Sequence, residues 1–168
     1  MSAATRLDPE AGLAPITVDW ELGFQEPSTI RALAYWRSLC NGHAMPSRRD
    51  LSPRDMRGFL SHVNLVDVVP GTGNVIDYIV SLQGTHARDV FGHLAGRRLR
   101  EMFPATLEQR WRNSFDLPRV AAAPVRLLTR ASTVGKDWLV CEALLAPLGD
   151  RSGAVHALFW ALAARVTK

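Results

Sequence analysis

Two strand-like runs separated by a short turn constrain the fold of this chain more than any other feature. Residues 63–69 and 75–82 are rich in β-branched residues, and the Pro-Gly-Thr-Gly-Asn segment at 70–74 between them breaks both helices and strands. The second run places four apolar side chains on one face: Ile76, Tyr78, Val80 and Leu82. The pattern predicts a β-hairpin whose apolar face points into a core.

Helices and then three more strands are expected after this hairpin. Residues 85–91 and 99–103 read as short helices, and a longer one follows Pro104, with Leu107, Trp111 and Phe115 at intervals of four, ending before Pro118. The segments 125–131, 137–146 and 155–166 are β-like and are separated by glycine-containing turns. The order of two strands, helices and three strands predicts an α+β fold.

The part before the hairpin is expected to be helical. Residues 28–40 repeat apolar side chains at helical spacing and end at Asn41-Gly42, and Ser52-Pro53 begins a second, short helix with Met56, Phe59 and Leu60 on one face. We therefore divide the chain into three parts. These are an N-terminal tail at 1–26, whose order the sequence leaves open, an N-terminal helical extension at 27–61, and a core at 62–168.

Composition places the chain among ordinary globular proteins. It has 168 residues, of which 47% are hydrophobic and 21% are charged, enough for one sizeable core. No apolar run reaches the roughly 20 residues that span a bilayer, and the N-terminus lacks the apolar segment of a secretory signal. We expect a cytoplasmic protein without membrane contact. Cys40 and Cys141 form no CxxC pair, which argues against a disulfide framework or a zinc site.

Several short segments, in order, carry a resemblance to a known family. They are Tyr35-Trp36-Arg37, the run at 45–53 (MPSRRDLSP), Gly84-Thr85, Phe91-Gly92, and Gly96-Arg97-Arg98-Leu99. Together they resemble a bacterial PAS-like family found mostly in alphaproteobacteria, in which a YWR helix and an lPsRrDidP segment precede the first strand and a GT…fG…tGrrl signature follows the second. The resemblance covers residues 30–165.

The resemblance implies a five-stranded antiparallel sheet with helices over one face, preceded by the N-terminal helices. It also implies a small-molecule cleft between helices and sheet, and use in signalling. By analogy, the helices of 85–111 would roof this cleft and the inward faces of the strands would floor it. The expected ligand-binding residues are His86, Arg88, Phe91, Trp111 and Trp138. The aromatic rings would shape the pocket, and Arg88 or His86 would pair with an anionic group.

The same resemblance implies a homodimer formed through the helix before the core. Its expected contacts are Ile30, Leu33 and Trp36. No effector segment remains once the PAS-like region is assigned, so the output is expected to pass to an unidentified signalling protein.

Cofactor binding has weaker support in the sequence. The five histidines show no HxxxH or HExxH spacing, so no metal site is expected. Haem bound through His86 or His93 is an alternative that we do not expect, and a small-molecule ligand of unknown identity is compatible with the cleft. Trp111 and Trp138 have an equally simple interpretation as core residues.

Two other classes of function remain as alternatives to a non-enzymatic sensor. Arg48, Arg49, Arg54 and Arg57, and then Arg97, Arg98 and Arg100, form basic clusters that nucleic acid would attract, but no aromatic residues alternate with them, and the net charge of +4 is modest. A small enzyme on the same fold would need a catalytic pair. The carboxylates, among them Asp77 and Glu142, are dispersed, and we expect them to be solvated or capping.

Overall fold

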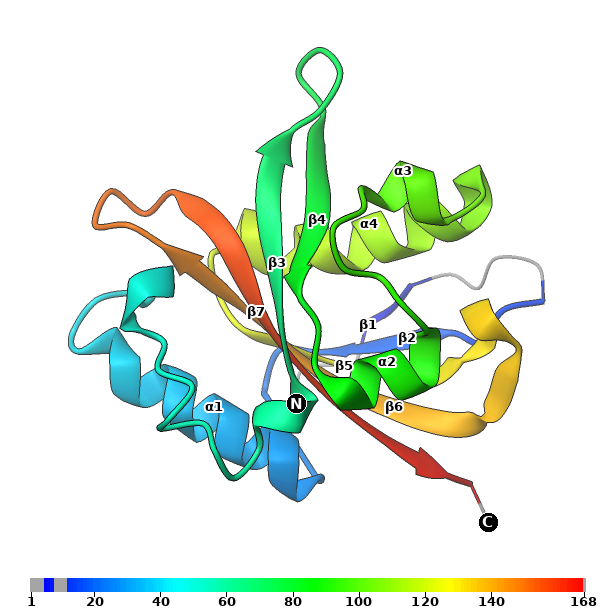
Figure 1. Ribbon diagram of the computed structural model, residues 1–168, viewed down its shortest axis with the longest axis horizontal. Helices are drawn as coiled ribbons and strands as arrows, with labels where there is room; N and C mark the ends of the chain where they lie inside the picture. Colours follow the sequence, from blue (N-terminus) through cyan, green and yellow to red (C-terminus); the bar gives the residue numbers. More distant parts are fainter. Residues whose placement is uncertain (1–4, 8–11, 168) are drawn as a thin grey trace.

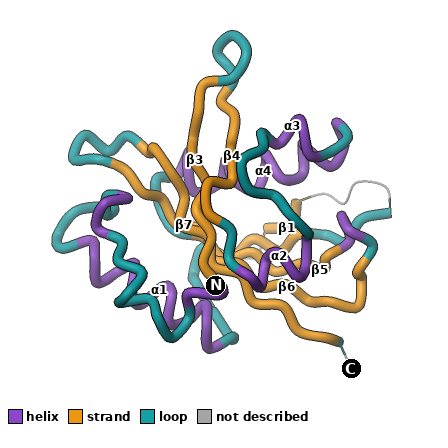
Figure 2. Tube along the Cα trace, in the orientation of Figure 1, coloured by secondary structure: helices purple, strands orange, loops and turns teal. Residues whose placement is uncertain are grey.

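One antiparallel sheet organises the part of the chain that this computed structural model describes, residues 5–7 and 12–167. Its strands are β1 Thr5–Leu7, β2 Ile16–Asp19, β3 Val63–Pro70, β4 Ile76–Leu82, β5 Val125–Ala131, β6 Lys136–Gly149 and β7 Val155–Val166. The seven strands are ordered β1-β2-β5-β6-β7-β3-β4, so β6 and β7 lie in the interior of the sheet. The predicted α+β class and antiparallel sheet are confirmed (Figure 2).

Helices cover both faces of this sheet. They are α1 Pro27–Cys40, α2 Thr85–Phe91, α3 Leu99–Met102 and α4 Ala105–Ala121, with 3-10 turns at Arg48–Asp50, Leu60–His62 and Ser132–Val134. Figure 1 shows α1 on one side of the sheet and α3 and α4 on the other, with the β3–β4 hairpin projecting beyond both. The expectation of helices over one face therefore holds for α2 to α4, while α1 packs on the opposite face.

Strand β7 has apolar side chains on both of its faces, which explains why helices cover both faces of the sheet. Leu158, Trp160 and Leu162 point to the cluster that includes Val90 of α2 and Phe115 of α4. The alternate residues Phe159 and Ala161 point to the cluster that contains α1. Because successive side chains of a strand point to opposite faces, an apolar run such as 155–166 is buried on both.

The N-terminal segment contributes two strands that the sequence pattern did not reveal. Ile16 and Val18 are 4% and 2% exposed, and β2 pairs with β5, so the sheet has seven strands instead of five. A four-residue strand is too short for its alternation to stand out in the sequence. The tail prediction for residues 1–4 and 8–11 lies outside the described residues.

The helix predicted to end before Pro118 continues to Ala121. Proline removes one helical hydrogen bond, and such a helix persists where other contacts hold both sides of the proline. Here Tyr78 makes those contacts, because its hydroxyl donates to Asp116 and accepts a hydrogen bond from Arg119 Nε at 2.7 Å. The tertiary contact outweighs the local preference.

The short helix predicted after Ser52 is a series of turns. Asp55 N–H donates to Ser52 O, and Phe59 N–H donates to Met56 O, three residues back in each case. Met56 and Phe59 are nevertheless buried as predicted, at 4% and 5% exposure. Burial of these side chains under α1 therefore does not require a regular helix.

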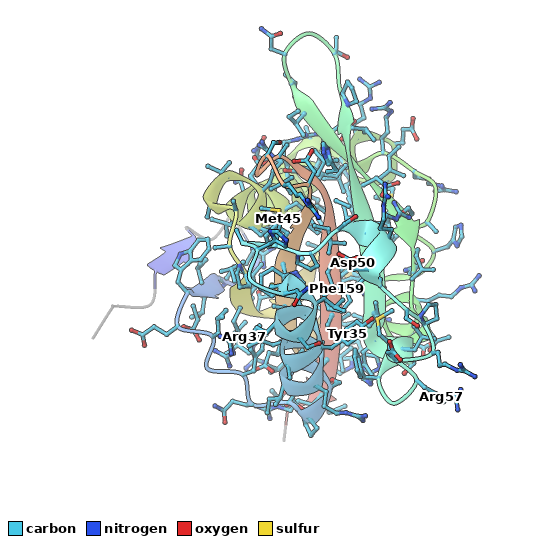
Figure 3. The ribbon with its side chains drawn as sticks, turned by 90° about the vertical axis from the view of Figure 1, so that its left-hand side faces the viewer. Tyr35, Arg37, Met45, Asp50, Arg57 and Phe159 are labelled. Atoms are coloured by element: carbon cyan, nitrogen blue, oxygen red, sulfur yellow. The ribbon has the colours of Figure 1, made fainter. Side chains whose placement is uncertain are left out.

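Helix α1 is fixed to the sheet by contacts at both of its ends. Toward its C-terminal end, Trp36 Nε1 donates a hydrogen bond to Pro147 O at 3.0 Å. Beside it, the rings of Tyr35 and Phe159 lie toward each other between helix and sheet, with centroids 6.4 Å apart (Figure 3). At the N-terminal end, Glu142 of β6 is 2% exposed and accepts hydrogen bonds from the amides of Gln25 and Glu26. A carboxylate in this position also interacts favourably with the helix dipole.

Glu142 is a buried, fully paired carboxylate that caps the start of α1, which is the capping alternative of the expected solvated or capping role. Thr29 Oγ1 donates to it, and Arg126 Nη2 forms an ion pair with it at 2.8 Å. Burial alone would raise the pKa of Glu142, but the hydrogen bonds from Thr29, Glu26, Gln25 and Arg126 outweigh burial and lower the pKa. Its contribution to stability is therefore present above the ordinary carboxyl pKa and is lost as the pH falls through the lowered value.

We predict that Glu142→Gln lowers the free energy of unfolding by about 3 kcal/mol at neutral pH, because it removes a charge that four donors share and leaves Arg126 without its buried partner. Urea unfolding checks the size of the change. The exposed carboxylate of Asp55 offers a control, and Asp55→Asn should change stability by less than about 0.5 kcal/mol. The wild-type loss of stability below about pH 4.5 should also become shallower in the Glu142 variant.

Candidate functional site

A cavity of about 80 Å³ lies between α4, the end of α2 and the inner face of the sheet. Most of its wall is apolar: Ile16, Phe91, Trp111, Phe115, Leu127, Cys141, Ala143, Leu145, Trp160 and Leu162. Its polar lining residues are Arg110, Ser114, Thr129, Arg130 and Thr133. An apolar hollow with a few polar groups is the usual form of a small-molecule site.

Aromatic rings build one wall of this cavity. Trp111 stacks on Phe103, with ring centroids 5.2 Å apart and planes 12° apart, and meets Phe91 edge-on at 4.9 Å. Phe115 and Trp160 approach Trp111 at 5.9 and 5.8 Å. Such contacts hold the rings in fixed orientations, so the shape of the wall is set by α2, α4 and β7 together.

The polar side of the cavity is also fixed by hydrogen bonds. Arg110 is 8% exposed, and its Nη2 donates to Thr129 Oγ1 at 3.0 Å. Thr129 Oγ1 donates to Pro15 O, and Ser114 Oγ donates to Arg110 O. Burial raises the pKa of the Cys141 thiol to about 11, so this thiol is protonated at neutral pH and is a poor nucleophile.

One polar group in the wall has no partner. Trp111 Nε1 is buried and has no hydrogen-bond partner among the residues that the structure describes. A buried N–H without an acceptor costs about 1–3 kcal/mol, and proteins seldom leave one unsatisfied. This donor is enclosed within the packing of the wall.

Helix α4 is held over the cavity by a buried carboxylate on the hairpin. Asp77, expected to be solvated or capping, is 2% exposed and forms ion pairs with Arg112 at 3.2 Å and Arg98 at 3.4 Å. Burial would raise the pKa of Asp77, but hydrogen bonds from the Tyr78 amide and from the two arginines lower it. The hairpin therefore positions the helix that carries Trp111.

Of the five predicted ligand residues, two lie in the cavity wall. These are Phe91 and Trp111. Arg88 is exposed, Trp138 is 54% exposed near the C-terminal end, and His86 contacts β7 outside the cavity. An ionic role for Arg88 or His86 inside this cavity does not fit these positions.

The polar wall formed by Arg110 and Ser114 was not predicted from the sequence. The stripe of α4 that faces the sheet continues at helical spacing through positions 107, 110, 111, 114, 115 and 118. Arg110 and Ser114 are polar residues within that stripe, and both are 8% exposed. In the sequence, the presence of polar residues at core-facing positions of an amphipathic helix was the pattern that could have indicated this polar wall.

His86 and His62 form a pair beside β7. Their ring centroids are 4.4 Å apart. Strand β3 pairs with β7 only as far as Ala161, and beyond that point His62 Nδ1 donates to Leu162 O at 2.8 Å while His86 Nε2 accepts from Ala164 N–H at 3.1 Å. The two imidazoles therefore replace the missing neighbouring strand and attach α2 to the sheet.

The predicted dimer contacts are mostly internal. Leu33 and Trp36 are 6% and 4% exposed because they pack between α1 and the sheet, while Ile30 is 47% exposed. An interface through Leu33 and Trp36 would require α1 to leave the sheet. The homodimer itself stays a prediction.

The two arginine clusters are partly used within the chain. Arg48 pairs with Asp67, Arg98 pairs with Asp77, and Arg100 donates to Thr72. Arg57 points outward from the segment beside α1 (Figure 3). The remaining arginines of the clusters, Arg49, Arg54 and Arg97, are also exposed.

The described part of the chain holds no cluster of metal-ligating side chains. No group of three or more His, Cys, Asp or Glu side chains there could hold a metal ion. His93 is exposed, His86 Nε2 accepts a hydrogen bond from Ala164, and neither histidine lines the cavity. Among residues 5–7 and 12–167, no helix is long and apolar enough to cross a membrane.

A family model described as PAS domain matches residues 24–163, which include α1, the hairpin, the cavity helices, β5, β6 and most of β7. No curated protein and no solved structure gives a significant match.

We predict that His86 makes the fold sensitive to mild acid. Burial, and then the neighbouring His62, lower the pKa of His86 below its ordinary value of 6.5. Because the unfolded chain takes up this proton more readily, stability should fall as the pH drops through about 6.5. Asp89, the nearby carboxylate, acts in the opposite direction but does not reverse the shift.

Urea unfolding at about pH 7.5 and about pH 5.5 tests this prediction. The difference in unfolding free energy between the two pH values should shrink in His86→Gln, whose amide oxygen can still accept from Ala164. The exposed His93→Gln variant is the matched control and should keep the wild-type difference. An unchanged pH dependence in His86→Gln would contradict the role assigned to this imidazole.

Proposed function

The chain belongs to the PAS domain family, and on that premise we propose that it is a sensor that binds a small molecule in the α4–sheet cavity and reports occupancy to a partner protein. The family places it among the sensory and interaction modules of signalling. The ligand and the signalling partner are the parts that this proposal adds.

The cavity carries the proposal. Its aromatic wall is held by ring contacts, and its polar groups are few. A structural core would be expected to close such a hollow. A ligand that fills the hollow accounts for this feature.

The arrangement of the walls supports a route for the signal. Phe91 belongs to α2, which is attached to β7 by the His86 contact, and Trp111 belongs to α4, which is held by Asp77. A ligand that contacts both helices binds best to one arrangement of them and raises the population of that arrangement. The exposed faces of α2 and α4 are then the surfaces for a partner to read.

We propose binding and not catalysis as the activity. The ionisable groups in the wall are two arginines and a thiol, Cys141, which stays protonated at neutral pH. General acid–base catalysis needs a group that titrates near the working pH beside the reacting atoms. These residues instead suit recognition of a ligand.

The proposal retains the homodimer and the cytoplasmic location expected from sequence. Of the predicted contact residues, Ile30 is the exposed one, so a dimer that preserves the fold would use Ile30 and its surroundings on α1. Native mass spectrometry of the purified protein reports the number of subunits together with any retained small molecule.

We predict that Ala143→Leu abolishes ligand binding without unfolding the protein. Ala143 lies on β6 in the cavity wall, so a leucine there would fill the space that a ligand needs. The free energy of unfolding should stay within about 1 kcal/mol of the wild type, because the added carbons enter a hollow.

Native mass spectrometry provides the test. The wild type should carry a defined added mass that Ala143→Leu lacks, and Ala154→Leu, in the exposed β6–β7 turn, should retain it. If an added mass persists in Ala143→Leu, the ligand occupies another place. If the wild type carries no added mass and binds no member of a small-molecule library, the sensory proposal fails.

A further inference from the structure

A groove of about 620 Å³ lies at the C-terminal end of α1, and none of its described lining residues also lines the α4–sheet cavity. The walls of this α1 groove are the last residues of α1, the loop at 43–50 and the β6–β7 turn at 149–151. Figure 3 shows two of the loop residues, Met45 and Asp50, beyond the end of the helix. Pockets for small molecules typically enclose about 300–1,000 Å³, so the α1 groove has a suitable size.

Hydrogen bonds and burial fix the walls of the α1 groove relative to each other. Gly149 N–H donates to Pro46 O at 3.0 Å, which joins the β6–β7 turn to the loop. Within the loop, Ser47 N–H donates to Asp50 Oδ2 at 2.8 Å, and Met45 is 5% exposed in the core under α1. The groove is therefore a set feature of the fold and not a gap between free loops.

The two carboxylates that line the α1 groove are already used within their own turns. Asp50 accepts the hydrogen bond from Ser47 N–H in a capping box. Asp150 accepts from the amide and the hydroxyl of Ser152, and His156 Nε2 donates to its other oxygen at 2.7 Å. The hydrogen bonds from Ser152 and His156 lower the pKa of Asp150 below its ordinary value.

The two arginines that line the α1 groove differ from these carboxylates. Arg49 comes from the loop and Arg151 from the β6–β7 turn, and both are exposed. Neither guanidinium has a hydrogen-bond or ion-pair partner among residues 5–7 and 12–167. An exposed arginine can satisfy its donors with water, so this alone is not unusual. Two such arginines on different walls of one groove, however, offer donors that match the oxygens of a phosphate or a carboxylate.

We propose that the α1 groove is a second binding site, which takes a small molecule with a phosphate or carboxylate group between Arg49 and Arg151. The C-terminal end of α1 carries partial negative charge, so the anionic group lies beside the arginines and not beside Asn41. This site uses none of the residues of the α4–sheet cavity and does not rest on the function proposed for that cavity.

Pyrophosphate is the first probe, because it presents oxyanions without any other chemistry. Isothermal titration calorimetry at constant ionic strength should show binding to the wild type. Arg49→Gln and Arg151→Gln should each weaken it by about three- to tenfold, the range for losing a charged hydrogen bond at a partly exposed site. Arg54→Gln removes the same charge from an exposed residue outside the groove and should leave the affinity within about twofold of the wild type.

A variant with the opposite expected effect separates electrostatics from damage to the groove. In Asp50→Asn the side-chain oxygen can still accept from Ser47 N–H, but a negative charge is lost from the groove wall. Pyrophosphate should therefore bind about two- to fivefold more tightly to this variant. Unchanged or weaker binding would contradict an anion held in the α1 groove.

A second probe, citrate, distinguishes a carboxylate ligand from a phosphate ligand, and preference for either one supports the site. NMR of the backbone amides should place the largest shifts at 43–50 and 149–151. The proposal is overturned if the wild type binds neither probe at millimolar concentration, or if Arg54→Gln weakens binding as much as Arg151→Gln.

The Ala143→Leu variant keeps the two proposals apart. It fills the α4–sheet cavity and leaves the α1 groove unchanged, so it should bind pyrophosphate as the wild type does. Loss of pyrophosphate binding in Ala143→Leu would move the anion to the α4–sheet cavity and overturn the second site. Failure of the cavity proposal in its own test leaves the outcome at the α1 groove unaffected.

Discussion

Strand β7 lies between β6 and β3 and carries apolar side chains on both of its faces, so each face needs its own cover. Helix α1 covers Phe159 and Ala161 on one side, and α2 and α4 cover Trp160 and Leu162 on the other. The residues toward α1 include alanines, whereas Trp160 is on the other face. The cavity lies on the Trp160 side, and both cores depend on the same strand.

Two buried carboxylates fix the helices that this arrangement requires. Glu142 holds the start of α1 through backbone amides, and Asp77 holds α4 through Arg112. Each carboxylate is surrounded by donors, which makes its burial favourable and gives it a strict geometry. The helix that carries Trp111 is therefore held by the ion pair of Arg112 with Asp77 and by the ring contacts of Trp111.

The cavity and the histidine pair meet at α2. Phe91, its last residue, forms part of the cavity wall, and His86, near its start, completes the hydrogen bonding of β7. The proposed ligand and the predicted proton uptake by His86 would therefore act on the same seven-residue helix.

The sequence by itself determined the local elements and their order. The β3–β4 hairpin, the last three strands, α1 and α2 follow from periodicity and turn residues, and Phe91 and Trp111 were placed beside the cleft by resemblance to the PAS-like family. Contacts between distant residues decided the rest. Pro118 stays helical because Tyr78 binds on both sides of it, β2 forms because β5 offers it an edge, and Asp77 and Glu142 are buried because arginines and amides from other elements reach them. Local pattern reports what each segment prefers, whereas the pairing of a buried charge or an unpaired indole N–H depends on neighbours that only the folded chain brings together.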